Sequence, residues 1–264
     1  MKKILLLLIG IASCWWQIPI SAAEPLSNAQ NRAQIHTELG AAYYSRGQIG
    51  VALEELKEAT KSSPRYAPAY NMLGLVYMEL RDDALAEKSF QQAFSLDETN
   101  PEIHNNYGWF LCQRGRIDDA IKHFFVALRN PLYATPEKSY LNAGVCSLKK
   151  NDDQGAEDYF QRALKLRPQE PQALYYLSEL AYKRMDYFEA KSYLAKLMQM
   201  ADPGSDILWL ALRIEHKLGN RDAEANYAQQ LSKNFPDSRE VQALRNGQYN
   251  YSDFAKLNGQ KVMK

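Results

Sequence analysis

The pattern that decides the fold lies in residues 73–93, LGLVYMELRDDALAEKSFQQA. Within this stretch a large residue precedes a glycine at Leu73-Gly74, and small, large and small residues follow at Ala86, Phe90 and Ala93. A shift of 34 residues in either direction finds the same order of residue types, which predicts tandem repeats. The clear copies are Leu39-Gly40, Ala52, Leu56 and Ala59; Tyr107-Gly108, Ala120, Phe124 and Ala127; and, after two extra residues, Ala143-Gly144, Ala156, Phe160 and Ala163. Two weaker copies follow, the first with Ala181, Ala190 and Leu194 and the second with Gly219, Leu231 and Pro236.

The spacing has a physical cause if each unit forms two antiparallel helices, A and B. The small residues then lie where the helices come closest, and the large residue four positions later fills the space beside them, because i and i+4 share a helix face. Gly47, Gly115 and Gly219 share the register of the A-to-B turn, where glycine tolerates positive φ. One pair cannot bury its apolar face alone, so the units must stack. The pattern resembles the tetratricopeptide repeat, and we predict an all-α solenoid, a right-handed superhelix of about six helix pairs over residues 33–236.

Two further segments flank the predicted repeats. Residues 1–23 have the parts of a Sec signal peptide, namely a basic start, a short apolar run and an exit of small residues. Cleavage before Cys14 would produce an acylated lipoprotein, whereas cleavage after Ala23 would release a soluble periplasmic protein. Either exit places the mature chain in the periplasm. We expect residues 237–264 to form a short capping helix, with Asp237 or Ser238 as its N-cap, and a polar tail.

Composition argues against several classes of function. The chain has 32 basic and 31 acidic residues, so it lacks the excess of positive charge that favours binding to nucleic acid. The four histidines lack metal-ligand spacing, and no phosphate-binding glycine loop or nucleophile elbow occurs. Paired carboxylates recur at the A-to-B turns, where negative charge suits the first turn of a helix. We therefore expect a protein that is not an enzyme and that uses no cofactor, metal or small-molecule substrate.

Cys112 and Cys146 occupy nearly equivalent positions on the A helices of consecutive repeats, which should lie side by side. In an oxidising compartment two such thiols can form a disulfide if their Cα atoms come within about 7 Å. The alternative is two separate buried cysteines that act as small apolar side chains. We favour the disulfide, which would clamp the third repeat to the fourth across the two-residue insertion.

The A helices should line the concave face of the superhelix and bind a protein partner there. An apolar and aromatic lining with a few amides suits an extended or helical peptide, whose apolar side chains enter pockets while amides bind its backbone. The alternative is that several of these side chains form the core between repeats. The predicted groove residues are Tyr44, Asn71, Leu75, Met78, Asn105, Trp109, Tyr175, Tyr182 and Trp209.

Residues 105–112, NNYGWFLC, together with 141–147, LNAGVCS, and 130–133, NPLY, resemble the type IV pilus biogenesis and stability family PilW/PilF. This resemblance implies an outer-membrane lipoprotein that acts as a pilotin and helps the pilus secretin to reach the outer membrane, multimerise or remain stable. It also implies lipidation at Cys14, with membrane contact only through that lipid, and it matches the family's cysteine pair to Cys112 and Cys146. The rival interpretation is a tetratricopeptide scaffold for another periplasmic envelope-assembly complex.

Overall fold

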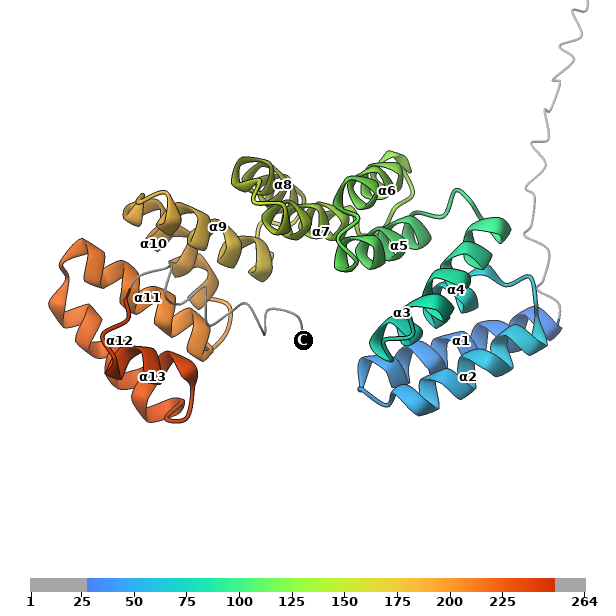
Figure 1. Ribbon diagram of the computed structural model, residues 1–264, viewed down its shortest axis with the longest axis horizontal. Helices are drawn as coiled ribbons and strands as arrows, with labels where there is room; N and C mark the ends of the chain where they lie inside the picture. The colour runs from blue at the N-terminus through green and yellow to red at the C-terminus, as the bar shows by residue number, and fades with distance from the viewer. Residues whose placement is uncertain (1–27, 250–264) are drawn as a thin grey trace, which may run out of the picture.

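The computed structural model describes residues 28–249, which form thirteen helices (Figure 1). The first twelve make six antiparallel pairs, and an arch of stacked pairs results, with α5 and α7 on its inner side and α6 and α8 on its outer side. This part of the chain contains no β-strand, so the predicted all-α repeat fold is confirmed. The helices are α1 (Asn28–Ser45), α2 (Ile49–Ser62), α3 (Ala67–Glu79), α4 (Asp83–Leu96), α5 (Pro101–Gln113), α6 (Ile117–Arg129), α7 (Pro136–Lys149), α8 (Asp153–Leu166), α9 (Pro171–Lys183), α10 (Tyr187–Met198), α11 (Ser205–Leu218), α12 (Arg221–Asn234) and α13 (Arg239–Arg245).

The turn between the two helices of each pair shows the repeat register directly. One residue in each of these six turns has a positive φ, and the intervals between successive ones are 34, 34, 36, 34 and 34 residues. The sixth unit, whose sequence is degenerate, therefore follows the same period as the others. Only three of the six positions are glycine, which explains why sequence inspection found only three: Gly47, Arg81, Gly115, Asn151, Met185 and Gly219.

Close approach of the paired helices accounts for the glycines inside the A helices. A Cβ atom built on Gly144 would lie 2.5 Å from Cε1 of Phe160, and one on Gly74 would lie 2.7 Å from the ring of Phe90. Both phenylalanines are completely buried. In the fifth repeat Ser178 occupies the glycine position, and its hydroxyl donates a hydrogen bond of 2.8 Å to the carbonyl oxygen of Ala190 on α10. In this repeat a serine with a hydrogen bond between the two helices thus takes the place of the glycine, and the helices remain paired.

The paired carboxylates at the turns have structural roles. Asp82 and Asp152 are N-caps, since their side chains accept hydrogen bonds from the amides of Leu85 and Gly155. The acidic residues of the first turns also form ion pairs with basic residues at the end of the next A helix, which connects neighbouring repeats. These pairs are Asp83 with Arg114, Asp118 with Lys150, and Asp153 with Lys183.

Helix α13 follows the sixth pair and packs against α11 and α12. Ser238 caps it by accepting a hydrogen bond of 3.2 Å from the amide of Val241, which is completely buried. The predicted signal peptide at residues 1–23, including Cys14, and the tail beyond Tyr249 lie outside the described residues. Within residues 28–249, none of the helices combines the length and the apolar character needed to cross a bilayer.

Candidate protein-binding groove

The predicted groove residues fall into two groups in the structure. Tyr44, Leu75, Met78, Trp109 and Tyr175 are partly exposed. The remaining four are buried, with exposed fractions of 7% for Asn71, 5% for Asn105, 5% for Tyr182 and 0% for Trp209. The inner helices are the first helices of the pairs, α1, α3, α5, α7, α9 and α11, of which the first four contact one another in succession, as do the last two. Their apolar surface is more open in the first half of the arch than in the second half.

The open surface is centred on α3 and α5, where Leu75, Met78 and Trp109 pack on the same buried core cluster while remaining partly exposed. The ammonium nitrogen of Lys149, on the next inner helix, lies 5.8 Å from the centroid of the Trp109 ring and donates a hydrogen bond of 2.7 Å to Gln113. Burial and the nearby charge of Arg114 lower the pKa of Lys149. An aromatic ring flanked by a positioned ammonium and an amide suits contact with a polypeptide.

A chain of amide side chains runs beside this apolar surface across three repeats. Asn106 donates to Asn71 at 3.3 Å, and Asn105 accepts from Ser139 at 2.9 Å and from Asn142 at 3.0 Å. Asn71 and Asn105 are thus buried connectors between repeats, which corrects their expected role as groove lining. The half-buried members are Asn106 and Asn142, which sequence reasoning missed. Asn142 lies 36 residues after Asn106, at the equivalent position of the next repeat, and that shared register is the signal that could have found them.

The inner face of the last two repeats is closed by a buried ion pair. Arg213 of α11 is completely buried and donates to the carboxylate of Glu179 of α9 at 2.7 Å, while its guanidinium lies 4.7 Å from the Tyr182 ring centroid. Burial raises the pKa of Glu179, and the charge of Arg213 opposes that rise. Burial also raises the pKa of Tyr175. Tyr182 is therefore part of the packing between repeats, contrary to the prediction that it lines an open groove.

Trp209 does not line an open groove either. Its ring is completely buried in a cluster that includes Leu231 of α12 and Val241 of α13. The Tyr249 ring stacks on it, with centroids 5.9 Å apart. The expectation for Trp209 was wrong because the chain continues past the sixth pair and covers the inner face of α11.

The structure places a disulfide between Cys112 of α5 and Cys146 of α7, with Cα atoms 5.8 Å apart. Both residues are buried in the core cluster beneath the open apolar surface. The bond joins the inner helices of the third and fourth repeats, so it restrains the two helices that carry Trp109 and Lys149.

A histidine pair lies behind the groove, between α5 and α6. The Nδ1 atoms of His104 and His123 are 2.9 Å apart, and Nε2 of His104 is 2.9 Å from the carbonyl oxygen of Glu98. Since that carbonyl can only accept, His104 carries its proton on Nε2 and His123 donates from Nδ1. Burial and the proximity of His104 lower the pKa of His123 to about 4, and burial also lowers that of His104. Both rings are therefore neutral near pH 7, where they support packing.

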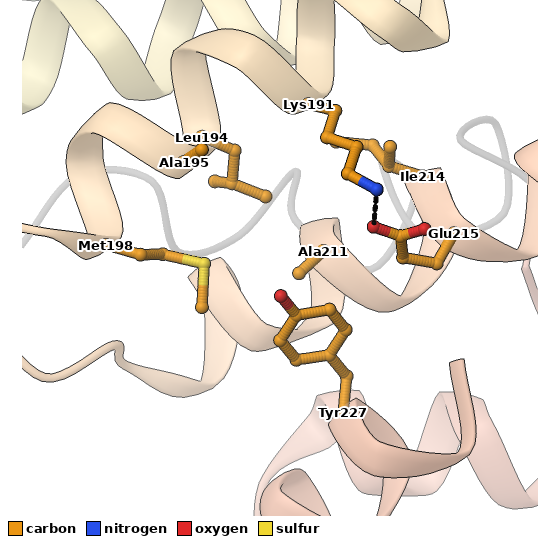
Figure 2. Close-up of a pocket in the computed structure, with 8 residues that line it drawn as sticks. All are labelled: Lys191, Leu194, Ala195, Met198, Ala211, Ile214, Glu215 and Tyr227. Atoms are coloured by element: carbon orange, nitrogen blue, oxygen red, sulfur yellow. Dashed lines mark ion pairs between the residues drawn. The ribbon is translucent and has the colours of Figure 1, made fainter. Parts of the chain in front are cut away.

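The cavity between α10, α11 and α12 holds about 50 Å³, far below the ~300–1,000 Å³ of typical small-molecule sites (Figure 2). Lys191 and Glu215 form an ion pair of 2.7 Å at one side of it, and the ring of Tyr227 lies at another side, next to Ala211. Its other lining residues are Leu194, Ala195, Met198, Ala211 and Ile214. Among the described residues, no group of three or more His, Cys, Asp or Glu side chains could hold a metal ion. The protein surface of the inner helices is thus the best candidate for a functional site.

Comparison with known proteins agrees with this architecture. Family models of the tetratricopeptide repeat match residues 40–80, 67–100, 89–122, 113–171 and 148–206. PilW, a widely conserved type IV pilus biogenesis factor with a crystal structure, is 34% identical in sequence to this chain. The match covers 80% of this chain and 97% of the PilW chain, with a TM-score of 0.73. This chain belongs to the PilW/PilF family.

Two further comparisons extend the PilW/PilF match along almost the whole chain. The type IV pilus assembly protein PilF of Pseudomonas aeruginosa is 27% identical over 245 residues, which is 92% of this chain and 96% of PilF. In a solved structure of Pseudomonas aeruginosa PilF, the sequence is also 27% identical. The match covers 84% of this chain and 100% of that PilF chain, with a TM-score of 0.75. A match over 92% of the chain spans the residues of all six repeats, including the degenerate last one.

Proposed function

We propose that this protein acts in type IV pilus biogenesis as a pilotin, an adaptor that binds the outer-membrane secretin and promotes its localisation, multimerisation or stability. The relatives PilW and PilF are a pilus biogenesis factor and a pilus assembly protein, which supports a role of this protein in type IV pilus biogenesis. The partly exposed apolar surface of Leu75, Met78 and Trp109 on the inner helices supports binding of a protein partner as the mode of action. This surface is the observation on which the proposal rests.

The chemistry of the surface favours a polypeptide partner with apolar side chains. Tryptophan and methionine supply a large contact area that adapts to different side chains, and energetically dominant interface residues are enriched in tryptophan. The half-buried amides Asn106 and Asn142 lie beside that area and offer donors and acceptors to a peptide backbone. An extended or helical secretin segment could therefore insert apolar side chains next to Trp109 while its backbone contacts the amides.

The N-terminal region completes the proposal. Acylation of Cys14 would tether the repeats to the periplasmic face of the outer membrane and raise the local concentration of a captured secretin subunit there. Cleavage after Ala23 would instead leave the adaptor soluble in the periplasm. A Cys14→Ala strain distinguishes these two cases, because only the tethered form loses its membrane fraction.

Substitution of Trp109 tests the binding surface. We expect Trp109→Ala to weaken binding to the purified periplasmic region of the pilus secretin by at least about tenfold, the scale of a dominant interface residue. Phe188→Ala is the matched control, because Phe188 is an aromatic residue 78% exposed on the outer helix α10. Binding is measured by fluorescence anisotropy, and thermal unfolding of each variant checks that the fold persists.

Equal binding by Trp109→Ala and wild type, with an intact fold, would reject this surface as the secretin site. Deletion of the gene tests the process separately, through the membrane location and multimer state of the secretin in cell extracts. Loss of multimers or secretin in the inner membrane supports the pilotin role. Normal multimers together with normal pili would favour a scaffold for another envelope-assembly complex.

A further inference from the structure

The chain reverses direction after α13 and returns to the inner face of its own repeats. Gly247 adopts a φ of +66°, and its amide donates to the carbonyl oxygen of Leu244 at 3.1 Å. The amide of Gln248 donates to the carbonyl oxygen of Ala243 at 2.9 Å. These two bonds end the helix with a left-handed glycine, a conformation that turns the chain sharply. The residue that follows, Tyr249, is directed onto α11.

Tyr249 contacts three aromatic residues of the inner helices. Its ring stacks on His216 with centroids 4.4 Å apart and an interplanar angle of 14°, and on Trp209 at 5.9 Å and 26°. The hydroxyl of Tyr182, on α9, donates to the backbone oxygen of Tyr249 at 3.5 Å. The chain thus presents both a ring and a carbonyl to two successive inner helices, which is the way an extended peptide ligand engages stacked repeats.

The contacted residues occupy repeated positions on the first helices of the last two pairs. Trp209 is equivalent, by the 34-residue and 36-residue intervals, to Asn105 and Tyr175, and His216 is equivalent to Met78 and Tyr182. Of these counterparts, Met78 and Tyr175 are partly exposed, whereas Asn105 and Tyr182 are buried. Tyr249 therefore covers, in the sixth repeat, positions whose counterparts Met78 and Tyr175 stay partly exposed in earlier repeats.

We propose that residues 246–249 are an internal ligand of the inner face, with Tyr249 as the anchor that occupies an aromatic slot formed by Tyr182, Trp209 and His216. A partner that inserts an aromatic side chain into the slot must first displace this segment. Tyr249 thereby limits access to this slot until such a partner arrives.

This proposal concerns the occupant of the fifth and sixth repeats and does not depend on the secretin being the partner. A tethered ligand has a high effective concentration, so it excludes the same sequence supplied as a separate molecule. Removing the anchor ring should therefore open the slot to an added peptide. A permanent structural cap would behave differently, because losing the ring would only lower stability.

The test measures binding of a fluorescein-labelled synthetic peptide of residues 246–264 to the full chain by fluorescence anisotropy. We expect Tyr249→Ala protein to bind this peptide at least about tenfold more tightly than wild type, given two aromatic contacts. Tyr249→Phe protein is the matched control, since it keeps the ring and should exclude the peptide as wild type does. A peptide carrying Tyr249→Ala should bind the opened protein weakly.

Two results would overturn the proposal. Equal affinity of the peptide for wild-type and Tyr249→Ala proteins would show that the tail does not occupy the slot. A lower melting temperature of Tyr249→Ala without any peptide binding would show that Tyr249 is only a structural cap of the sixth repeat. Hydrogen exchange of α11 provides the second measurement, because an opened slot raises exchange there and added peptide should restore protection.

Discussion

Replacing Gly144 with alanine should destabilise the fourth repeat by an amount that the structure allows us to bound. The new Cβ would lie 2.5, 2.7 and 2.8 Å from three carbons of the Phe160 ring. That ring is completely buried and stacks on Tyr176 with centroids 5.0 Å apart, so it has little room to move away. Overpacking of this kind costs about 1–3 kcal/mol, and the better helix propensity of alanine returns about 1 kcal/mol. We expect a net loss of up to about 2 kcal/mol.

Gly50→Ala is the matched control, because Gly50 also lies in a helix but no atom comes within 4 Å of a Cβ built on it. Only the propensity gain applies there, so we expect stabilisation of up to about 1 kcal/mol. Urea unfolding followed by circular dichroism measures both variants. In a chain of this size each kcal/mol corresponds to about 2–4 °C in melting temperature. If Gly144→Ala were as stable as Gly50→Ala, close helix approach would not be the reason for the repeated glycine.

Other contacts lead to three more predictions. The disulfide of Cys112 and Cys146 closes a loop with a sequence separation of 34, so the double serine variant should lose about 4 kcal/mol by chain entropy, and an unchanged urea midpoint under oxidising conditions would contradict this. Because the pKa of His123 falls to about 4 from 6.5, the neutral ring's contribution to stability is complete above pH 6.5 and is lost as the pH falls toward 4. Since His123 is only about half buried, we expect this loss of stability to be about 1–2 kcal/mol. Urea unfolding at pH 7.5 and pH 5 should show the loss in wild type, and a similar loss in His123→Gln would refute the assignment to His123. Met185 adopts a φ of 67° at 73% exposure, so Met185→Gly should stabilise the protein by about 0.5–1 kcal/mol in thermal unfolding, and a lower melting temperature would argue against backbone strain there.

Much of the repeat architecture is predictable because it depends on local spacing. Each helix pair brings together residues that are close in the sequence, such as Gly74 and Phe90, which are 16 positions apart. The period therefore identifies the contacts within a pair from the sequence alone. The period was hardest to recognise in the sixth repeat. There Glu224 occupies the usual alanine position, and its carboxylate forms a hydrogen bond of 2.9 Å with the His216 ring. A polar contact there replaces the small residue that the pattern requires, so sequence similarity faded while the pairing remained.

The sequence by itself determined the helix pairs, their register and the inner positions at which a partner could be met, since these depend on residues within one or two periods. Only the tertiary structure decided which inner positions are open. Trp109 and Trp209 both belong to the inner helices, yet the first is partly exposed and the second is completely buried. The two tryptophans occupy different positions in the repeat, and Trp209 also packs against α13 and against Tyr249, which lies 40 residues beyond it. Burial depends on every segment that packs against a site, and no spacing within a repeat records a segment that arrives from outside it.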